Sequence, residues 1–250
     1  MNLSVADSPL SPLPTIFCAA DTTSLDQAMA LAALMQRAGC GIKLGLEFFN
    51  AQGPQGVADI RTSYTDLPIF LDLKYHDIPN TVAGAMRAIA PLGVDIVNVH
   101  ATGGVAMMIQ ARTALHEACQ ACGTVPPKIL GVTLLTSLDE KAASQAGFTA
   151  PLREQIVALA RLTQEAGLDG VVCSAHEIEA IRAACGSSFM LVVPGIRPDG
   201  SDQGDQKRVM TPADAVAKGA DHLVIGRPIT LQDDPAAEAV KIRRTLPGEQ

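Results

Sequence analysis

The stretch Pro68-Ile-Phe-Leu-Asp-Leu-Lys-Tyr-His-Asp-Ile-Pro-Asn-Thr81 decides how the rest of the chain is interpreted. Its apolar run, Ile69 to Leu73, is typical of a buried parallel strand, which should be continuously hydrophobic. Charges nevertheless end the run. Asp72 and Lys74 lie two positions apart and therefore point to the same side of the strand. Because a desolvated carboxylate and ammonium are costly to keep in a protein interior, we expect this pair to be functional.

Short β-branched runs alternate with longer helical patterns on both sides of this stretch. The sequence predicts eight strands, each followed by a helix, at about 15–20, 41–45, 69–73, 94–100, 128–135, 169–174, 189–194 and 221–226. Without a linker-like gap, these units predict a single α/β domain, a (β/α)8 TIM barrel over residues 14–250, after an N-terminal extension of residues 1–13. A doubly wound open sheet is the alternative. The glycine fingerprint of dinucleotide-binding sheets is missing after the first strand, however, where the sequence reads Ala20-Asp21-Thr22-Thr23.

The amino-acid composition excludes some classes of protein function. The chain has 250 residues, a net charge of −7, 48% hydrophobic residues and only 3% aromatic residues. An acidic chain with few aromatic side chains is not expected to bind nucleic acid through a basic surface or base stacking. We expect no membrane helix and no signal peptide, because long apolar runs and a basic N-terminal region are missing. Six cysteines spread through apolar segments predict reduced core residues of a cytoplasmic protein.

Reactive side chains recur at the carboxyl ends of the predicted strands, where TIM barrels build their active sites. These residues are Asp21, Lys43, Asp72, Lys74, Asp77, Thr136, Ser137, Arg197 and Arg227. Isolated charges at a barrel mouth usually form a solvated rim. Two lysines and two aspartates from the second and third strands converge here, which favours an active site over a rim.

A phosphate site is predicted at the far side of the mouth. Gly226-Arg227-Pro228 follows the eighth strand, and barrels often bind phosphate with the loops after strands seven and eight. Backbone N–H groups of the glycine turn and a bidentate guanidinium would hold the dianion. Arg197 is either a second clamp or a rim charge, and Gln206 in the polar segment 199–208 is a candidate ligand contact. The residues alone predict a phosphorylated small molecule and Lys/Asp proton or charge chemistry without a metal.

Five motifs occur in order along the chain: Asp72-x-Lys74-x-x-Asp77 with Lys43 upstream, Thr133-Leu-Leu-Thr-Ser137, Val193-Pro-Gly-Ile-Arg-Pro198, Gly204-Asp-Gln206 and Val224-Ile-Gly-Arg-Pro228. Together they resemble the orotidine 5′-phosphate decarboxylase family, in its bacterial branch, from about residue 14 to 240. The first motif alone is less specific, because related barrel decarboxylases and synthases acting on sugar phosphates share it.

The resemblance implies a carboxy-lyase that converts orotidine 5′-monophosphate to UMP, the last step of de novo pyrimidine synthesis, without metal or cofactor. It implies a charged array of Lys43, Asp72, Lys74 and Asp77, in which Lys74 protonates C6. It also implies a homodimer in which Asp77 and Thr81 reach into the partner's site. The implied ligand contacts are Asp21 and Lys43 to the ribose, Thr136 or Ser137 to the pyrimidine, and Gln206, Gly226 and Arg227, with Arg197 nearby, to the phosphate.

Two alternatives stay open at this point. A Mg²⁺-dependent decarboxylase or aldolase of a ketose phosphate would use the same barrel, although the long segment 197–208 favours a nucleotide. A barrel that binds nucleotides without catalysis is the second alternative, against which the intact lysines and aspartates weigh. We interpret His76 as an orienting or solvent-facing residue rather than a general base. His100 is interpreted as a packing group without an assigned role.

Overall fold

Eight parallel strands close into a barrel in which each strand pairs with its neighbours in chain order. The computed structural model describes residues 13–198 and 210–248. The strands are β1 (Ile16–Ala20), β2 (Gly41–Gly45), β3 (Ile69–Tyr75), β4 (Ile96–His100), β5 (Lys128–Val132), β6 (Gly170–Val172), β7 (Met190–Pro194) and β8 (His222–Ile225). Pairing of β8 with β1 completes the circle and confirms the predicted TIM-barrel fold. The predicted N-terminal extension lies almost wholly outside the described residues and stays a prediction.

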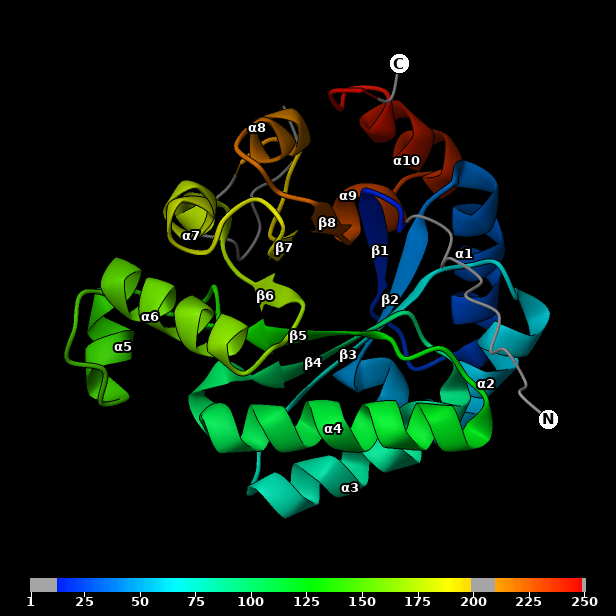
Figure 1. Cartoon of the computed structure of the whole chain (residues 1–250). Coiled ribbons are helices and arrows are strands. Elements are labelled where there is room, and N and C mark those ends of the chain that lie inside the picture. Colours follow the sequence, from blue (N-terminus) through cyan, green and yellow to red (C-terminus); the bar gives the residue numbers. More distant parts are fainter. Residues whose placement is uncertain (1–12, 199–209, 249–250) are drawn as a thin grey trace.

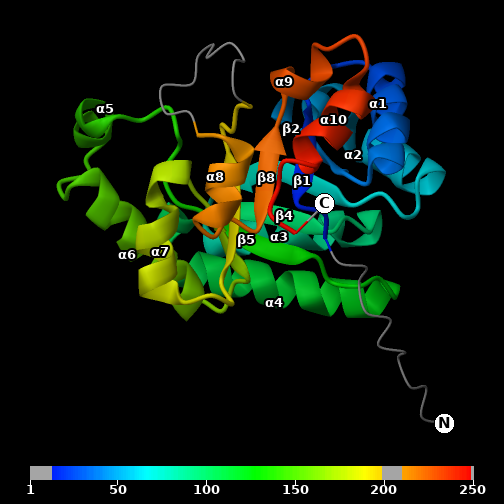
Figure 2. The ribbon, with the colours of Figure 1, turned by 90° about the horizontal axis from the view of Figure 1, so that it is seen from above.

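Helices surround the barrel, as Figure 1 shows. They are α1 (Leu25–Ala38), α2 (Leu46–Ser63), α3 (Pro79–Ile89), α4 (Val105–Cys122), α5 (Glu140–Gln145), α6 (Leu152–Glu165), α7 (Ile178–Cys185), α8 (Pro212–Ala217), α9 (Arg227–Thr230) and α10 (Pro235–Arg243). Helix α3 packs along α4, and α1 packs along α10. The β5–β6 connection carries two helices, of which α5 lies at the outer edge of the molecule in both views (Figures 1 and 2). No helix within the described ranges has the length and apolar character needed to cross a membrane.

Local sequence signals set the ends of several helices. The Ser24 side chain accepts the N–H of Gln27 and caps α1, and Gly39 ends it in the left-handed conformation, at φ 68°. Pro79 occupies the first turn of α3, where a missing N–H costs nothing. The Thr211 side chain likewise caps α8. Such boundaries can be read from a sequence, because caps depend on residues that are neighbours in the chain.

The barrel interior is filled by a compact apolar layer. Phe17 and Phe70 meet edge to face, with ring centroids 6.1 Å apart. Around them lie Ala19, Ile96, Leu130, Val132, Val172, Val192 and Val224. A larger apolar cluster fills the space between the strands and the surrounding helices. Because side chains alternate along a strand, the inward residue that follows Phe70 is Asp72, which places charge directly above the apolar layer.

Several strands differ from their predicted bounds, and β3 and β5 differ where site residues lie. β3 continues past Leu73 to Tyr75, through an irregular pairing with β4. β5 ends at Val132 rather than Leu135, because its neighbour β6 ends at Val172 and offers no further residue for the ladder. Thr133 donates both its N–H and its hydroxyl to the Val172 carbonyl. Residues 136 and 137 consequently lie in a turn beyond the strand instead of directly at its end.

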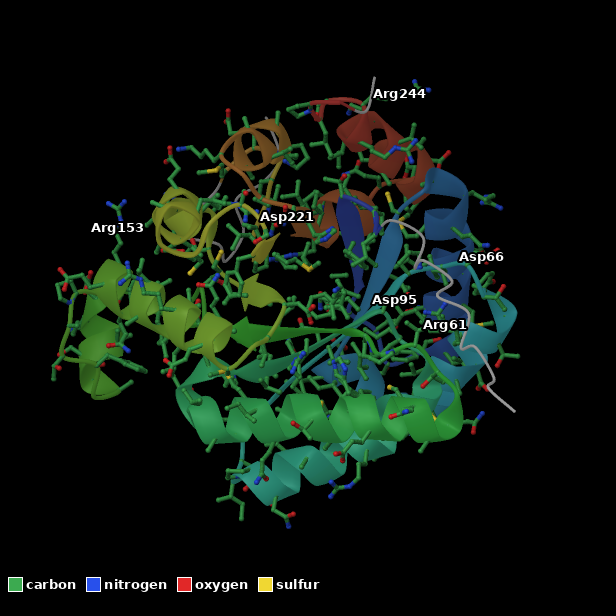
Figure 3. All side chains as sticks on the ribbon, viewed as in Figure 1. Arg61, Asp66, Asp95, Arg153, Asp221 and Arg244 are labelled. Carbon is green, nitrogen blue, oxygen red and sulfur yellow. The ribbon has the colours of Figure 1, made fainter. Side chains whose placement is uncertain are left out.

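A carboxylate joins two neighbouring strands at the amino end of the barrel, in three places. Asp95, directly before β4, accepts the N–H of Ile69 at 2.7 Å and pairs with Arg61 of α2. Figure 3 shows Arg61 and Asp95 close together. The arrangement recurs where Asp169 accepts from Ile129 and pairs with Lys128, and where Asp221 accepts from Leu191 and pairs with Arg182. We call Asp95, Asp169 and Asp221 the amino-end carboxylates.

Candidate active site at the barrel mouth

A continuous row of ion pairs crosses the carboxyl ends of β1, β2 and β3. Asp72 lies between two lysines, with its Oδ2 3.5 Å from Lys43 Nζ and its Oδ1 2.6 Å from Lys74 Nζ. Lys43 Nζ also lies 3.6 Å from Oδ1 of Asp21, at the end of β1. A Cβ at Gly45 would lie only 3.2 Å from Lys43 Nζ, so a glycine leaves room for this ammonium group. The expected pairing of Asp72 with Lys74 is therefore observed.

The row is desolvated at its centre. Lys43 and Asp72 are buried, with 9% and 8% of their surface exposed. Burial by itself would raise the pKa of the Asp72 carboxyl. The ammonium groups of Lys43 and Lys74 outweigh burial, together with hydrogen bonds from Lys74 and Asn98, and hold the pKa of Asp72 below its ordinary value of 3.8. Asp72 is consequently a fixed negative charge at neutral pH.

Lys74 has an unusual backbone conformation. Among the described residues it is the only non-glycine residue with a positive φ, at 51°. Such a conformation costs about 1–3 kcal/mol for a residue with a side chain and persists only where surrounding contacts hold it. The contact here is Asn98, whose Oδ1 accepts the Lys74 N–H at 2.8 Å and whose Nδ2 donates to Asp72 Oδ1 at 2.7 Å.

Asn98 is a site residue that the sequence interpretation missed. It is fully buried in the middle of β4. A signal was present, because a carboxamide interrupts the apolar run of the fourth strand at a position with the same parity as His100. Its partners lie on another strand, 24 and 26 residues away, and could not be read from the run itself.

A cavity of about 300 Å³ opens above the row of ion pairs. Its polar lining consists of Asp21, Lys43, Asp72, Lys74, Thr136, Gly195, Arg197, Gly226 and Arg227, and its apolar lining of Ala19, Phe70, Val172, Pro194 and Val224. The lysines come from β2 and β3, whereas the arginines follow β7 and β8. The cavity therefore has one cationic group of residues near Asp72 and another on the side of β8. A second cavity, of about 440 Å³, lies outside the barrel against α8 and α10.

The remaining predicted site residues are placed differently. Asp77 is exposed, and in the described structure its carboxylate accepts the N–H of Ile78 at 2.6 Å rather than joining the row of ion pairs. Thr81 is also exposed, in the first turn of α3, and Ser137 is exposed beside Thr136. Gln206 lies outside the described residues. One chain thus brings most of the predicted residues together but leaves Asp77 and Thr81 facing outward.

Two histidines lie at the edge of the mouth. The rings of His76 and His100 have their centroids 5.3 Å apart. His76 is exposed, as its interpretation as a solvent-facing residue requires. Burial lowers the pKa of His100, and the neighbouring charges of His76 and Lys74 lower it further, against the opposing effect of Asp72. His100 is therefore neutral at neutral pH and adds no positive charge beside Lys74.

Comparisons with known proteins agree with this geometry. Residues 14–242 match the model of the orotidine 5′-phosphate decarboxylase / HUMPS family. The chain is 50% identical over 231 residues to an orotidine 5′-phosphate decarboxylase of Paramagnetospirillum magneticum, covering 92% of this chain and 97% of that protein. It is 52% identical over 234 residues to the orotidine 5′-phosphate decarboxylase of Rhodospirillum rubrum, covering 94% of this chain and 93% of that protein. The crystal structure of the Lactobacillus acidophilus orotidine 5′-phosphate decarboxylase superposes with a TM-score of 0.82, at 34% identity, covering 93% of this chain and 98% of that one.

Proposed function

The chain belongs to the orotidine 5′-phosphate decarboxylase / HUMPS family and decarboxylates orotidine 5′-monophosphate to UMP in pyrimidine biosynthesis; we propose that it does so with Lys74 as the proton donor. The observation that carries the proposal is the Lys43–Asp72–Lys74 row at one side of a cavity whose other side holds Arg197 and Arg227. A nucleotide with a reacting carboxylate at one end and a phosphate at the other matches this distribution of charge.

The chemistry we infer is electrostatic. The bond between C6 and the carboxylate breaks, CO2 leaves, and the electron pair stays on C6, where the pyrimidine ring delocalises it poorly. The Lys74 ammonium stabilises this developing negative charge in a site with little water and then donates a proton to C6. Lys74 regains its proton from solvent after product release. The reaction as proposed needs no metal and no cofactor.

Asp72 has two roles in this proposal. Its fixed negative charge holds the ammonium groups of Lys43 and Lys74 at the reacting end of the cavity. It also faces the substrate carboxylate, and a like-charge contact at about 4 Å is worth roughly 4 kcal/mol at an effective dielectric constant near 20. That repulsion is relieved when CO2 leaves, so it favours the transition state over the bound substrate.

The other contacts of the substrate are proposed by residue type. Asp21 and Lys43 bind the ribose hydroxyls, and Thr136 or Ser137 contacts the pyrimidine. The phosphate contacts are Gln206, Gly226 and Arg227, with Arg197 beside them. The Arg197 and Arg227 positions at the cavity support the phosphate assignment, because a guanidinium binds a phosphate in a bidentate manner. Binding energy from these groups, far from C6, drives the substrate into the desolvated site.

We also propose a homodimer in which Asp77 and Thr81 complete the partner's site, and a cytoplasmic location. The outward placement of both side chains supports the dimer, as does Ile78 between them, an isoleucine that is 66% exposed. The six free cysteines are in keeping with a reducing compartment. Asp77 would then extend the alternation of charges to the partner's lysines.

Subunit mixing tests the shared site. Lys74→Ala and Asp77→Ala proteins should each be nearly inactive, whereas random mixed dimers should regain activity in about one quarter of all sites. The matched control mixes Lys74→Ala with Asp72→Ala. Those two residues serve the same barrel, so activity should not return. Equal behaviour of the two mixtures in verified mixed dimers would contradict the shared site.

The ultraviolet absorbance change on conversion of orotidine 5′-monophosphate to UMP tests the function directly. We expect full turnover after exhaustive chelation. Loss of activity that Mg²⁺ restores would instead favour a metal-dependent sugar-phosphate enzyme. Nucleotide binding without any turnover would favour a barrel that only binds nucleotides.

A further inference from the structure

Asn98 is a buried polar side chain inside the barrel that the proposed chemistry does not use. It lies at the centre of β4, fully shielded from solvent. On the same face of this strand, Ile96 belongs to the apolar layer below it and His100 lies at the strand end. A buried carboxamide must have its hydrogen bonds satisfied, and both of its partners lie on β3. The side chain therefore ties two strands together.

Asn98 forms these hydrogen bonds at the point where the regular pairing between β3 and β4 is interrupted. Leu71 pairs with Val97 and Tyr75 pairs with Val99, so three residues of β3 lie opposite one residue of β4. Those three residues include Asp72 and Lys74. An extra stretch in one strand leaves backbone groups without ladder partners and re-aims the side chains that it carries. Asn98, the single residue opposite this stretch, supplies the missing acceptor for the Lys74 N–H.

Asn98 is the acceptor in one of its two side-chain hydrogen bonds and the donor in the other. Asn98 Oδ1 accepts from the main chain of Lys74, and Nδ2 donates to the Asp72 oxygen that also receives the Lys74 ammonium. A carboxamide provides an acceptor and a donor at once, whereas an ionised carboxylate only accepts and an aliphatic side chain does neither. The residue type thus matches the two groups that it holds.

We propose that Asn98 is a positioning residue for proton transfer. It fixes the main chain of Lys74 and the carboxylate of Asp72, so that the Lys74 ammonium is presented to the cavity. This inference rests on the proposed role of Lys74 as the proton donor. Asn98 acts through these two residues, which line the cavity, and it does not itself touch the substrate.

Loss of the amide should lower turnover more than binding. Without Asn98, the left-handed conformation at Lys74 loses its hydrogen bond and relaxes, which moves the ammonium group relative to C6. A displacement of about 1 Å in a catalytic group costs on the order of 100-fold in rate. The proposed phosphate contacts lie on the β7 and β8 side, and the proposed ribose contacts, Asp21 and Lys43, lie at the ends of β1 and β2. Both sets stay in place, so KM should change little.

The test compares Asn98→Ala with Asn98→Asp, which keeps the volume and the acceptor but loses the donor. We expect kcat to fall about 100-fold for Asn98→Ala and at least about tenfold for Asn98→Asp, with KM within about threefold of the wild type. The matched control is Thr163→Val. Thr163 is fully buried on α6, and its hydroxyl donates to Leu159 of its own helix. This control should lower the melting temperature while leaving kcat unchanged.

The outcomes separate this inference from the function on which it rests. A wild-type protein without turnover contradicts the function itself. A wild type that turns over, a Lys74→Ala protein that does not, and a folded Asn98→Ala protein with wild-type kcat contradict only the positioning role. A rise in KM at unchanged kcat would also overturn it. If Asn98→Ala does not melt cooperatively, Asn98→Ser, which keeps a smaller hydrogen-bonding group, takes its place with the same expected split between kcat and KM.

Discussion

Both ends of the barrel carry carboxylates that pair with basic side chains, and the two sets are satisfied in different ways. At the amino end, each carboxylate accepts a backbone N–H from the neighbouring strand and pairs with one basic side chain, as Asp169 does with Ile129 and Lys128. At the mouth, the carboxylate group of Asp72 is bound only by side chains within the described part of the chain, namely those of Lys43, Lys74 and Asn98. The amino-end carboxylates hold the backbone, whereas Asp72 holds cations against an open cavity.

This difference indicates what each set contributes. A carboxylate bonded to an N–H near the start of the neighbouring strand ties the two strands together and stabilises the fold. An aspartate desolvated between two lysines gains its Coulomb energy at a desolvation cost that can exceed it, so the pair is weak evidence for stability. We therefore expect charges at the mouth to control catalysis with little effect on unfolding, and charges at the amino end to do the reverse.

The largest expected effect is that of Lys74→Ala. We propose that this ammonium stabilises and protonates C6, so its removal should lower kcat by about 1000-fold or more, with a melting temperature close to that of the wild type. Lys128→Ala is the matched control, because Lys128 is also paired with an aspartate, at 2.9 Å, but at the other end of the barrel. It should keep full turnover. Near-normal activity of Lys74→Ala would remove this residue from the mechanism.

Arg227→Ala distinguishes the two cationic sides of the mouth, the arginines that follow β7 and β8 from the lysines of β2 and β3. A hydrogen bond to a charged group is worth about 1.5–3 kcal/mol, so loss of this guanidinium should raise KM roughly 10- to 100-fold. The effect on kcat should be smaller, because the phosphate is far from C6. Steady-state kinetics against Arg244→Ala, an exposed arginine at the edge of the molecule in Figure 3, provides the check. An unchanged KM would place the phosphate elsewhere.

Asp95→Ala tests the amino end. The substitution leaves the Ile69 N–H and one of the two NH2 groups of Arg61 without an acceptor, and it should lower the free energy of unfolding by about 1–3 kcal/mol. Urea unfolding measures this loss, and kcat of the folded protein should not change. Asp66→Ala is the control, since Asp66 is exposed and its loss should cost less than about 0.5 kcal/mol. A fall in kcat without a fall in stability would break the proposed division between the two ends.

The smallest expected effect is on the pH dependence of the free energy of unfolding. His222, at the start of β8, is buried, and burial lowers its pKa below 6.5 in spite of the hydrogen bond with the Pro14 carbonyl and the nearby Asp221. As pH falls below 6.5, the unfolded chain takes up a proton that the folded protein does not, so stability decreases, by at most about 1.4 kcal/mol per pH unit. His222→Gln should flatten this dependence in urea unfolding between pH 7 and about pH 5.

The comparison with the wild type isolates this one group. The pKa values of His100 and His116 are also lowered by burial, but both histidines are present in both proteins. A slope that is identical in wild type and His222→Gln would contradict the assignment. The His222→Gln substitution should not change catalytic activity at neutral pH, because His222 lies at the amino end of the barrel, away from the mouth.

Much of the candidate site could be predicted from the sequence, because its residues follow strands whose order in the barrel is their order in the chain. Asp72 and Lys74 were expected on one side of β3, and their side chains do meet. They meet across an irregular stretch in which Lys74 has a positive φ, which the alternation of a regular strand does not predict. Asp77, only three residues from Lys74, was expected in the charged array, yet within one chain it faces outward.

The sequence by itself determined the alternation of eight strands and helices, the helix caps and the chemical types gathered at the mouth. These features depend on periodicities of about two and 3.6 residues and on contacts between near neighbours in the chain. Only the tertiary structure decided that Asn98 holds Lys74, that Asp72 lies between two lysines, and that Thr136 reaches the cavity from a turn. The physical reason is that such contacts depend on the register between strands, which closure of the whole barrel fixes and no single segment encodes.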